Sequence, residues 1–138
     1  MSGEKLKLKR TPADAAFSEA IRELYHHECQ NCGSVENLQC CHILTRKFGS
    51  TRTDPNNAVC LCGTCHANFT QDEFLWADWC IDRWGRAYVD QIRHKARNIT
   101  VKRNKLYIKD CAAHFRKETE RLKLLRLDGQ KGKLEPYD

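Results

Sequence analysis

No segment of the sequence approaches the roughly 20 consecutive apolar residues that a membrane-spanning helix needs, which excludes a transmembrane protein. The first ten residues are polar and basic and no apolar segment follows them, so we expect no secretory signal. Internal repeats and low-complexity segments are absent as well. These absences lead us to expect a cytoplasmic protein that has no membrane partner.

The nine cysteines are not expected to form a disulfide framework. Disulfides are rare in a reducing cytoplasm, and an odd number of cysteines cannot all pair within one chain. A metal site is therefore the leading explanation for so many cysteines in 138 residues. A chain of this length suits one folded domain and leaves little room for a second.

Hydrophobic spacing and turn residues predict an α+β protein whose C-terminal half is mostly helical. Apolar residues recur every three or four positions after Thr11, which predicts a helix over about 13–28. Residues 35–44 mix β-branched and aliphatic residues with cysteine and predict a strand, and the turn formers of 45–57 predict a loop. A second cysteine turn then leads into a short helix.

Three more helices are predicted in the second half of the chain. Asp72 is a candidate N-cap for a helix that ends at Gly85, and a further helix is expected to end near Asn98. Asn104 is a candidate N-cap for a last long helix. We therefore divide the chain into a flexible basic arm, a zinc-stabilised core with a leading helix, a helical DNA-binding extension and a disordered tail. The predicted bounds of these four parts are 1–12, 13–70, 71–127 and 128–138.

Two cysteine pairs have the spacing with which adjacent thiolates bind one tetrahedral Zn²⁺ ion, namely Cys29-x2-Cys32 and Cys62-x2-Cys65. A glycine beside each pair helps the backbone to turn around the metal. Because four thiolates leave no open position for water or substrate, we expect a structural zinc rather than a catalytic one. The other cysteines on apolar faces are expected to be small buried hydrophobic residues: Cys40, Cys60, Cys80 and Cys111.

Three polar residues lie between or directly after the cysteine pairs. His42 follows the predicted strand, Asn57 closes the loop, and His66 directly follows the last zinc cysteine. Taken alone, each histidine is more often a satisfied core residue than a functional one. Together with the cysteines they form the ordered set Cys-x2-Cys, His, Asn, Cys-x2-Cys-His. In this set, and in the segment LQCCHILTRKFGSTRTDPNNAVCLCGTCHANF (38–69), the sequence resembles the HNH nucleases, also called ββα-metal or His-Me finger nucleases.

A narrower resemblance points to phage proteins. The stretch CHILTRKFGSTRTDPNN is similar to a segment of phage NinG-type recombination nucleases and related phage HNH proteins. The resemblance implies a small zinc-stabilised ββα-metal core of treble-clef type with flanking helices. It also implies a metal-dependent DNA endonuclease that hydrolyses phosphodiester bonds. Such an enzyme would be phage-encoded, would work in the cytoplasm of a bacterial host, and would act in recombination or DNA processing.

The resemblance also assigns roles to particular residues. His42 would be the general base that activates water, since a neutral imidazole can accept a proton at pH 7. His66 would hold a single divalent ion such as Mg²⁺, Mn²⁺ or Ni²⁺, and Asn57 would hold the loop so that the His42 ring is correctly oriented. Many family members have Asp or His immediately before the base as a second metal ligand, where this chain has Cys41. A thiolate suits softer ions than Mg²⁺, which leaves the identity of the catalytic metal open.

Positive charge is concentrated in one segment of the chain. Residues 93–133 carry 14 basic and 4 acidic groups, a net charge of +10 in a chain whose total is +6. Such a basic block is typical of nucleic-acid binders, although a solvated helix can have the same composition. We expect contacts with the phosphates of duplex or branched DNA. The expected DNA-binding residues are Arg46, Lys47, Arg52, Lys102, Arg103, Lys105 and Lys109.

Two other functions fit part of the pattern. A non-catalytic zinc module that binds DNA or protein would explain the four cysteines and the basic segment, but it leaves Asn57 and the two histidines without a role. A zinc-dependent nucleobase deaminase is a weaker alternative: His26-His27-Glu28 contains a His-x-Glu pattern, but no proline precedes a Cys-x2-Cys pair. The candidate protein partners are a second copy of the chain, forming a homodimer, and a phage protein.

Overall fold

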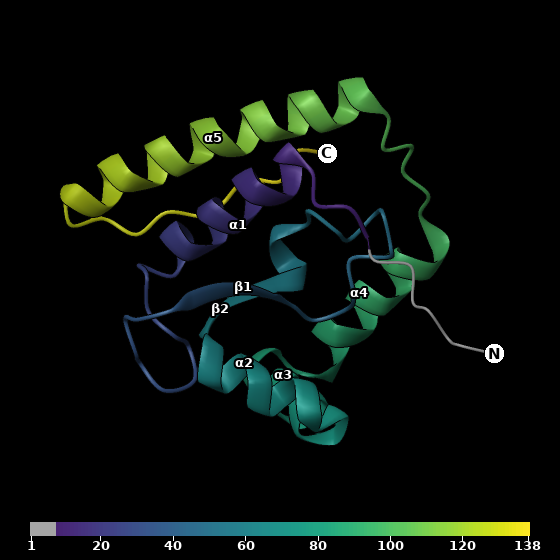
Figure 1. Cartoon of the computed structure of the whole chain (residues 1–138), viewed down its shortest axis with the longest axis vertical. Coiled ribbons are helices and arrows are strands. Elements are labelled where there is room, and N and C mark those ends of the chain that lie inside the picture. The colour runs from purple at the N-terminus through teal and green to yellow at the C-terminus, as the bar shows by residue number, and fades with distance from the viewer. Residues whose placement is uncertain (1–7) are drawn as a thin grey trace.

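The computed structural model describes residues 8–138 and has an α+β architecture (Figure 1). Within this part of the chain, five α-helices surround a two-stranded antiparallel sheet. None of these helices is both long and apolar enough to cross a bilayer. Of the predicted basic arm, residues 1–7 lie outside the described residues. The elements are α1 (Pro12–Leu24), β1 (Leu38–His42), β2 (Ala58–Cys62), α2 (Gly63–Gln71), α3 (Glu73–Trp84), α4 (Arg86–Asn98) and α5 (Lys105–Leu127), with a 3₁₀ helix η1 (Pro55–Asn57) before β2.

The leading helix α1 begins at Pro12 because Thr11 and Asp14 cap its first turn. The Asp14 backbone N–H donates to the Thr11 hydroxyl, and the Thr11 backbone N–H donates to the Asp14 carboxylate. The helix ends at Leu24 rather than at the predicted residue 28. The reason is that His26 and His27 both adopt positive φ, with values of 56° and 53°, which no α-helix accommodates.

The two strands pair in an antiparallel register that sets Leu38 opposite Cys62 and His42 opposite Ala58. The strand β1 is shorter than the predicted strand over 35–44, because Asn37 adopts a φ of 50° just before it. In Figure 1 the sheet lies between α1 and α5 on one side and α2 and α3 on the other. Every residue of β2 is buried, so this strand lies at the centre of the fold.

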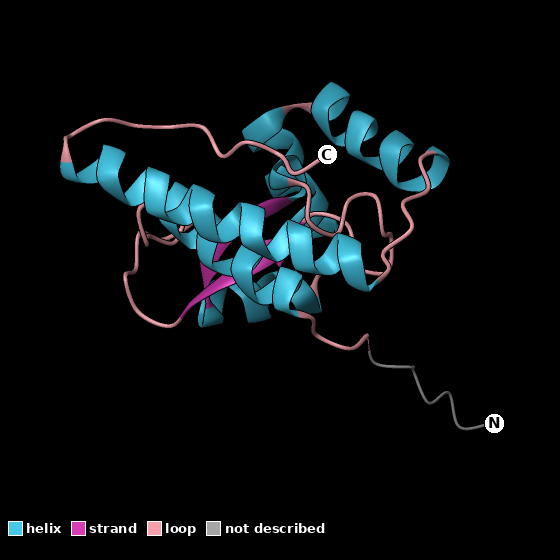
Figure 2. Cartoon of the chain, turned by 90° about the horizontal axis from the view of Figure 1, so that it is seen from above, coloured by secondary structure: helices cyan, strands magenta, loops and turns pink. Residues whose placement is uncertain are grey.

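The helices α1 and α5 pack along one another and form the first of two apolar cores (Figure 2). Phe17 and Phe115 meet edge to face with their ring centroids 5.1 Å apart, and Ile21 is fully buried beside them. At the far end of the core, Arg126 Nε donates to the buried Glu23 carboxylate over 2.7 Å. These contacts hold the basic helix α5 against the leading helix.

The second core joins the sheet to α2 and α3. Val59 and Leu61 of β2 pack there against Phe69, whose ring centroid lies 5.0 Å from that of Trp76. Trp76 and Trp79 stack with their planes 12° apart. This aromatic layer lies behind the cysteine turns and supports them.

The prediction of a disordered tail over 128–138 is wrong, because this segment runs back along α5 (Figure 2). Leu134 is buried in the core formed by α1 and α5, and the backbone N–H of Glu135 donates to the Glu118 carboxylate over 2.8 Å. The glycines and proline of the segment suggested fraying. Its order comes instead from side chains on α5 that lie far away in the sequence.

Local signals predicted the helices of the second half correctly. The Asp72 carboxylate accepts from the Leu75 N–H and caps α3, which ends at Gly85 with a φ of 89°. The helix α4 ends at Asn98, and Asn104 caps α5 by accepting from a backbone N–H in its first turn. Each of these ends depends on residues close in sequence, which is why the sequence alone locates them.

The loop between β1 and η1 is held by elements on several sides. Most of residues 50–54 are buried although they belong to no helix or strand. Lys95 of α4 forms an ion pair with Asp54 at 2.8 Å, and Arg103, just before α5, donates from Nη1 to the Thr53 hydroxyl over 3.1 Å. This loop is therefore a rigid part of the fold, and it forms one wall of the histidine pocket described below.

Candidate metal centre and histidine pocket

The four cysteines of the predicted zinc site lie together in the structure. The Sγ atoms of Cys29, Cys32, Cys62 and Cys65 are all within 4.8 Å of one another. The first pair lies in the turn after α1, and the second pair connects the end of β2 to the first turn of α2. This cluster can hold a metal ion such as zinc.

Two glycines allow the cysteine turns to close. Gly33 adopts a φ of 80°, which residues with a side chain rarely adopt. A Cβ atom at Gly63 would collide with the side chain of Asn37, and the Gly63 N–H donates to the Asn37 carbonyl over 2.9 Å. The close approach of these two segments brings the second cysteine pair to the first.

The environment lowers the pKa of Cys29, whereas at Cys65 the hydrogen bond from Asn31 is outweighed by burial and the neighbouring cysteines, which raise the pKa to about 12. Burial alone would raise the pKa of Cys29, but the backbone groups of Cys32 and Cys62 lower it to about 6. Asn31 donates from Nδ2 to Cys65 Sγ over 3.3 Å, and Trp79 Nε1 in turn donates to the Asn31 Oδ1. A set of four sulfur donors held in this way fits zinc and leaves no position for substrate, so the ion would be structural.

The cysteines predicted to be small buried residues follow that prediction with one exception. Cys60, Cys80 and Cys111 are buried, and burial raises the pKa of Cys60 to about 11 and that of Cys80 to about 12. Cys40 is partly exposed and lines a cavity beside His42. Cys40 is the central residue of β1, and it packs against the core of α1 and α5 while one side of it borders the cavity.

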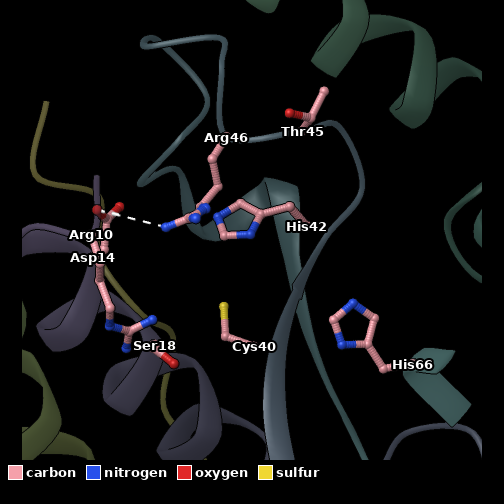
Figure 3. Close-up of a pocket in the computed structure, with 8 residues that line it drawn as sticks. All are labelled: Arg10, Asp14, Ser18, Cys40, His42, Thr45, Arg46 and His66. Atoms are coloured by element: carbon pink, nitrogen blue, oxygen red, sulfur yellow. Dashed lines mark ion pairs between the residues drawn. The ribbon is translucent and has the colours of Figure 1, made fainter. Parts of the chain in front are cut away.

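A cavity of about 420 Å³ lies between α1, the end of β1 and α2 (Figure 3). Figure 3 shows His42 and Cys40 coming from the strand, Asp14 and Ser18 from α1, and His66 from the opposite side. We call this cavity the histidine pocket. Its lining residues are Arg10, Asp14, Ser18, Cys40, His42, Thr45, Arg46 and His66.

The His42 ring is held in one tautomer. Its Nε2 lies 2.8 Å from the backbone carbonyl oxygen of Arg52, and since a carbonyl oxygen only accepts, this nitrogen carries the proton. The other nitrogen, Nδ1, is then left with a lone pair. Burial lowers the pKa of His42 below its usual value, so the ring is neutral at pH 7. A neutral, oriented imidazole of this kind can accept a proton.

Asn57 is fully buried and closes the loop that carries Arg52. Its Oδ1 accepts from the Leu44 N–H over 2.9 Å, and its Nδ2 donates to the carbonyl oxygens of Leu44 and Thr51, each over 3.0 Å. The hydrogen bonds of the Asn57 side chain thus go to the backbone of the loop rather than to either histidine ring. Asn57 acts on His42 through the loop, by fixing the backbone that presents the Arg52 carbonyl.

His66, in the first turns of α2, is oriented by Gln39 of β1. The His66 Nδ1–H donates to the Gln39 Oε1 over 2.6 Å, which leaves its Nε2 with a lone pair for a metal ion. Burial lowers the pKa of His66, so this ring is neutral as well. His42 and His66 also line a second, smaller cavity of about 80 Å³ together with Cys41.

Cys41 lies in the apolar core beside Val59 and Phe69 and is 2% exposed. Burial raises the pKa of its thiol strongly. A thiol that keeps its proton is a poor ligand for a divalent cation, so the environment of Cys41 disfavours its use beside His66.

The arginines expected at phosphates differ in their availability. Arg52 forms a bidentate pair with the buried Asp14 carboxylate, with Nη2 and Nε at 2.6 and 2.8 Å from its oxygens. Arg46 is 3.9 Å from the same carboxylate and faces the pocket (Figure 3). Lys47 is exposed and lies over the Phe48 ring. Arg46 and Lys47 can thus meet a phosphate, whereas Arg52 is engaged within the protein.

The basic residues near α5 differ in the same way. Lys102, Lys105 and Lys109 are exposed, as a phosphate-binding role requires. Arg103 is half-buried, donates from Nη1 to the Thr53 hydroxyl, and packs on the Tyr107 ring with its guanidinium carbon 5.1 Å from the centroid. Arg103 therefore supports the rigid loop.

Several residues of the histidine pocket and its surroundings carried no recognised functional signal in the sequence, among them Asp14, Arg10 and Gln39. Asp14 carries only a helix-capping signal in the sequence, and its pairing with Arg52 joins positions 38 residues apart. Arg10 lies in a stretch that the sequence showed only as a basic arm. Gln39 occupies a strand position with no distinctive pattern. A capping box is the one local signal among these three.

Comparisons of the chain with protein-family models, with curated proteins and with solved structures found no match. The function therefore has to be argued from the site itself.

Proposed function

We propose that the protein is a metal-dependent DNA endonuclease of the HNH type. The observation that carries this proposal is that His42 and His66 line one pocket, and that each ring has one nitrogen in a hydrogen bond and the other nitrogen left with a lone pair. The Arg52 carbonyl leaves Nδ1 of His42 free, and Gln39 leaves Nε2 of His66 free. One ring is then suited to accept a proton and the other to hold a cation. The order of β1, β2 and α2, and the adjoining cysteine cluster, also support the proposal.

In the proposed reaction, His42 accepts a proton from a water molecule at Nδ1 as the water oxygen forms a bond to phosphorus. The bond between phosphorus and the ester oxygen of the leaving nucleotide breaks, and that oxygen takes a proton from solvent. A divalent cation held at His66 would offset the charge that develops on the phosphate and the leaving oxygen. Arg46, at the edge of the pocket, is placed to bind a non-bridging phosphate oxygen.

The second candidate function is a non-catalytic zinc module that binds DNA or protein. The burial of Cys41 favours it, because a buried thiol deprives the proposed catalytic ion at His66 of the second ligand expected from the position before His42. Such a module would keep the cysteine cluster and the basic helix while losing hydrolysis.

Plasmid nicking with and without Mg²⁺, Mn²⁺, Co²⁺ or Ni²⁺ separates these functions. We expect His42→Ala to lower the cleavage rate by about 10²–10⁴-fold, the range for loss of a general base. His66→Ala should also lower it, and higher metal concentration should partly restore activity. The matched control is His94→Ala, at an exposed position on α4 away from the pocket, which should cleave like the wild type.

The zinc content and DNA affinity of all three variants should match those of the wild type, since the cysteines and exposed cations are unchanged. If His42→Ala cleaves as fast as His94→Ala, His42 is not the base. A wild-type protein that binds DNA but cleaves none with any of the four ions supports the non-catalytic module.

A further inference from the structure

A groove of about 560 Å³ lies between the start of α1 and the first half of α5. It is lined by five exposed cations and by no acidic side chain of the described residues. Exposed Pro12 and partly exposed Ile108 provide apolar surface between these cations, with the buried Ala112 beneath them. We call this surface the α1–α5 groove. Its cations are Lys9, Arg10, Lys105, Lys109 and Arg116.

The α1–α5 groove adjoins the histidine pocket. Arg10 lines both of them, so the two hollows share a border at this side chain. In Figure 1 the chain enters α1 next to the first half of α5, which brings Lys9 and Arg10 opposite the lysines of that helix. A polymer whose backbone lies in the histidine pocket can therefore continue past Arg10 into the groove.

The spacing of the cations suits a chain of phosphates. Lys105 and Arg116, with Lys109 between them, lie eleven positions apart on α5, about 16 Å at 1.5 Å per residue. Phosphates of one DNA strand recur about every 3.4 Å along a duplex, so this length covers about five phosphate intervals, fewer in a more extended strand. Cations from the start of α1 and from α5 border this groove on two sides, so they can contact the backbone of one strand.

The apolar surface in the groove distinguishes between duplex and single-stranded ligands. In a duplex the base faces are stacked inside, so the strand would meet the cations and leave Pro12 and Ile108 uncovered. In a single strand the bases are free to lie on apolar surface without sequence preference. Because no aromatic side chain lines this groove among the described residues, the affinity would come mainly from phosphate contacts and would depend strongly on salt.

We propose that the α1–α5 groove binds a single-stranded segment of the nucleic-acid substrate next to the scissile phosphate. This inference rests on the proposed function for the position of the cut, and it specifies the substrate class as DNA with a single-stranded flank. It adds Lys9 and Arg10 to the binding surface and gives Lys105 and Lys109 a defined strand to contact.

The test measures binding of the wild-type protein, with its zinc and without added divalent ion, to polythymidine of about 15 nucleotides. The groove variant is Lys105→Gln/Lys109→Gln. The matched control is Lys117→Gln/Lys123→Gln, which removes the same charge from the same helix outside the groove. The affinity of each protein for polythymidine and for a blunt duplex is measured between about 50 and 200 mM salt. Thermal melting of both variants confirms that they fold.

We expect the groove variant to bind polythymidine about tenfold or more weakly than the wild type. The slope of the logarithm of the binding constant against the logarithm of the salt concentration should also become less steep by about 1.4, or 0.7 for each lost contact. The control variant and the blunt duplex should change much less. Equal losses in the two variants, or equal losses for single strand and duplex, would overturn the proposal. A groove variant that leaves polythymidine binding unchanged but turns a dimer into a monomer would also overturn it, in favour of a second copy.

A DNA cleavage assay with the same variants separates this inference from the proposed function. If the groove variant loses polythymidine affinity as expected while the wild type cuts no DNA, the groove stands and the nuclease function fails. If the wild type cuts DNA but cuts substrates with and without a single-stranded flank equally well in both variants, the nuclease stands and the groove proposal fails.

Discussion

The pairing of Asp14 with Arg52 gives a stability prediction that can be worked out from the structure. The Asp14 side chain is 4% exposed, and its two oxygens accept from Arg52 over 2.8 and 2.6 Å. Burial by itself would raise the pKa of Asp14, but hydrogen bonds from Arg52 and Thr11 lower it from 3.8 to about 2. At 1.36 kcal/mol per unit, this difference corresponds to about 2 kcal/mol of stability at neutral pH.

We therefore expect Asp14→Asn to reduce the free energy of unfolding by about 2 kcal/mol at pH 7, measured by urea denaturation of the zinc-loaded protein. The folded-state pKa is lower than the unfolded one, so the contribution is fully present above about pH 4 and is lost as the pH falls toward 2. The advantage of the wild type over Asp14→Asn should shrink accordingly below pH 4.

A double-mutant cycle with Arg52→Gln isolates the pair. We expect the two substitutions together to cost clearly less than the sum of their separate effects, with a coupling of about 1–2 kcal/mol. Asp78→Asn, at an exposed position on α3, is the matched control and should stay within about 0.5 kcal/mol of the wild type. A coupling below about 0.5 kcal/mol would refute the reasoning, because the two side chains would then stabilise the fold independently.

Two further predictions test the metal centre and the C-terminal segment. Elemental analysis should find one zinc per chain, and Cys62→Ser should lose the metal and melt at a lower temperature. Cys80→Ser should keep a full zinc content, and equal zinc in both variants would contradict the assignment. Leu134→Ala should lower the free energy of unfolding by about 2–3 kcal/mol because Leu134 is 7% exposed, while Leu127→Ala should have little effect because Leu127 is 80% exposed. Similar losses for the two variants in urea denaturation would show that the segment 128–138 does not pack against the helices.

Several features of this protein follow from the sequence by itself. The spacing within each Cys-x2-Cys pair predicted two ligands of the cluster, because cysteines three residues apart in a turn already face the same ion. Asp72 and Asn104 predicted where α3 and α5 begin, because capping joins groups three residues apart. Interactions of such short range need no knowledge of the rest of the fold.

The roles of other residues were decided by the tertiary structure. Arg52 and Arg103 both read as phosphate contacts, yet the one pairs with Asp14 and the other holds Thr53, partners 38 and 50 residues away. Leu134 packs against α1 and α5, helices that precede it in the sequence. A side chain's partner across such a distance depends on how the helices pack, and packing is set by the shape of the whole core rather than by local pattern. For that reason the sequence predicted which residues have the chemistry to bind a metal ion, a proton or a phosphate, and the fold decided which of them face the pocket.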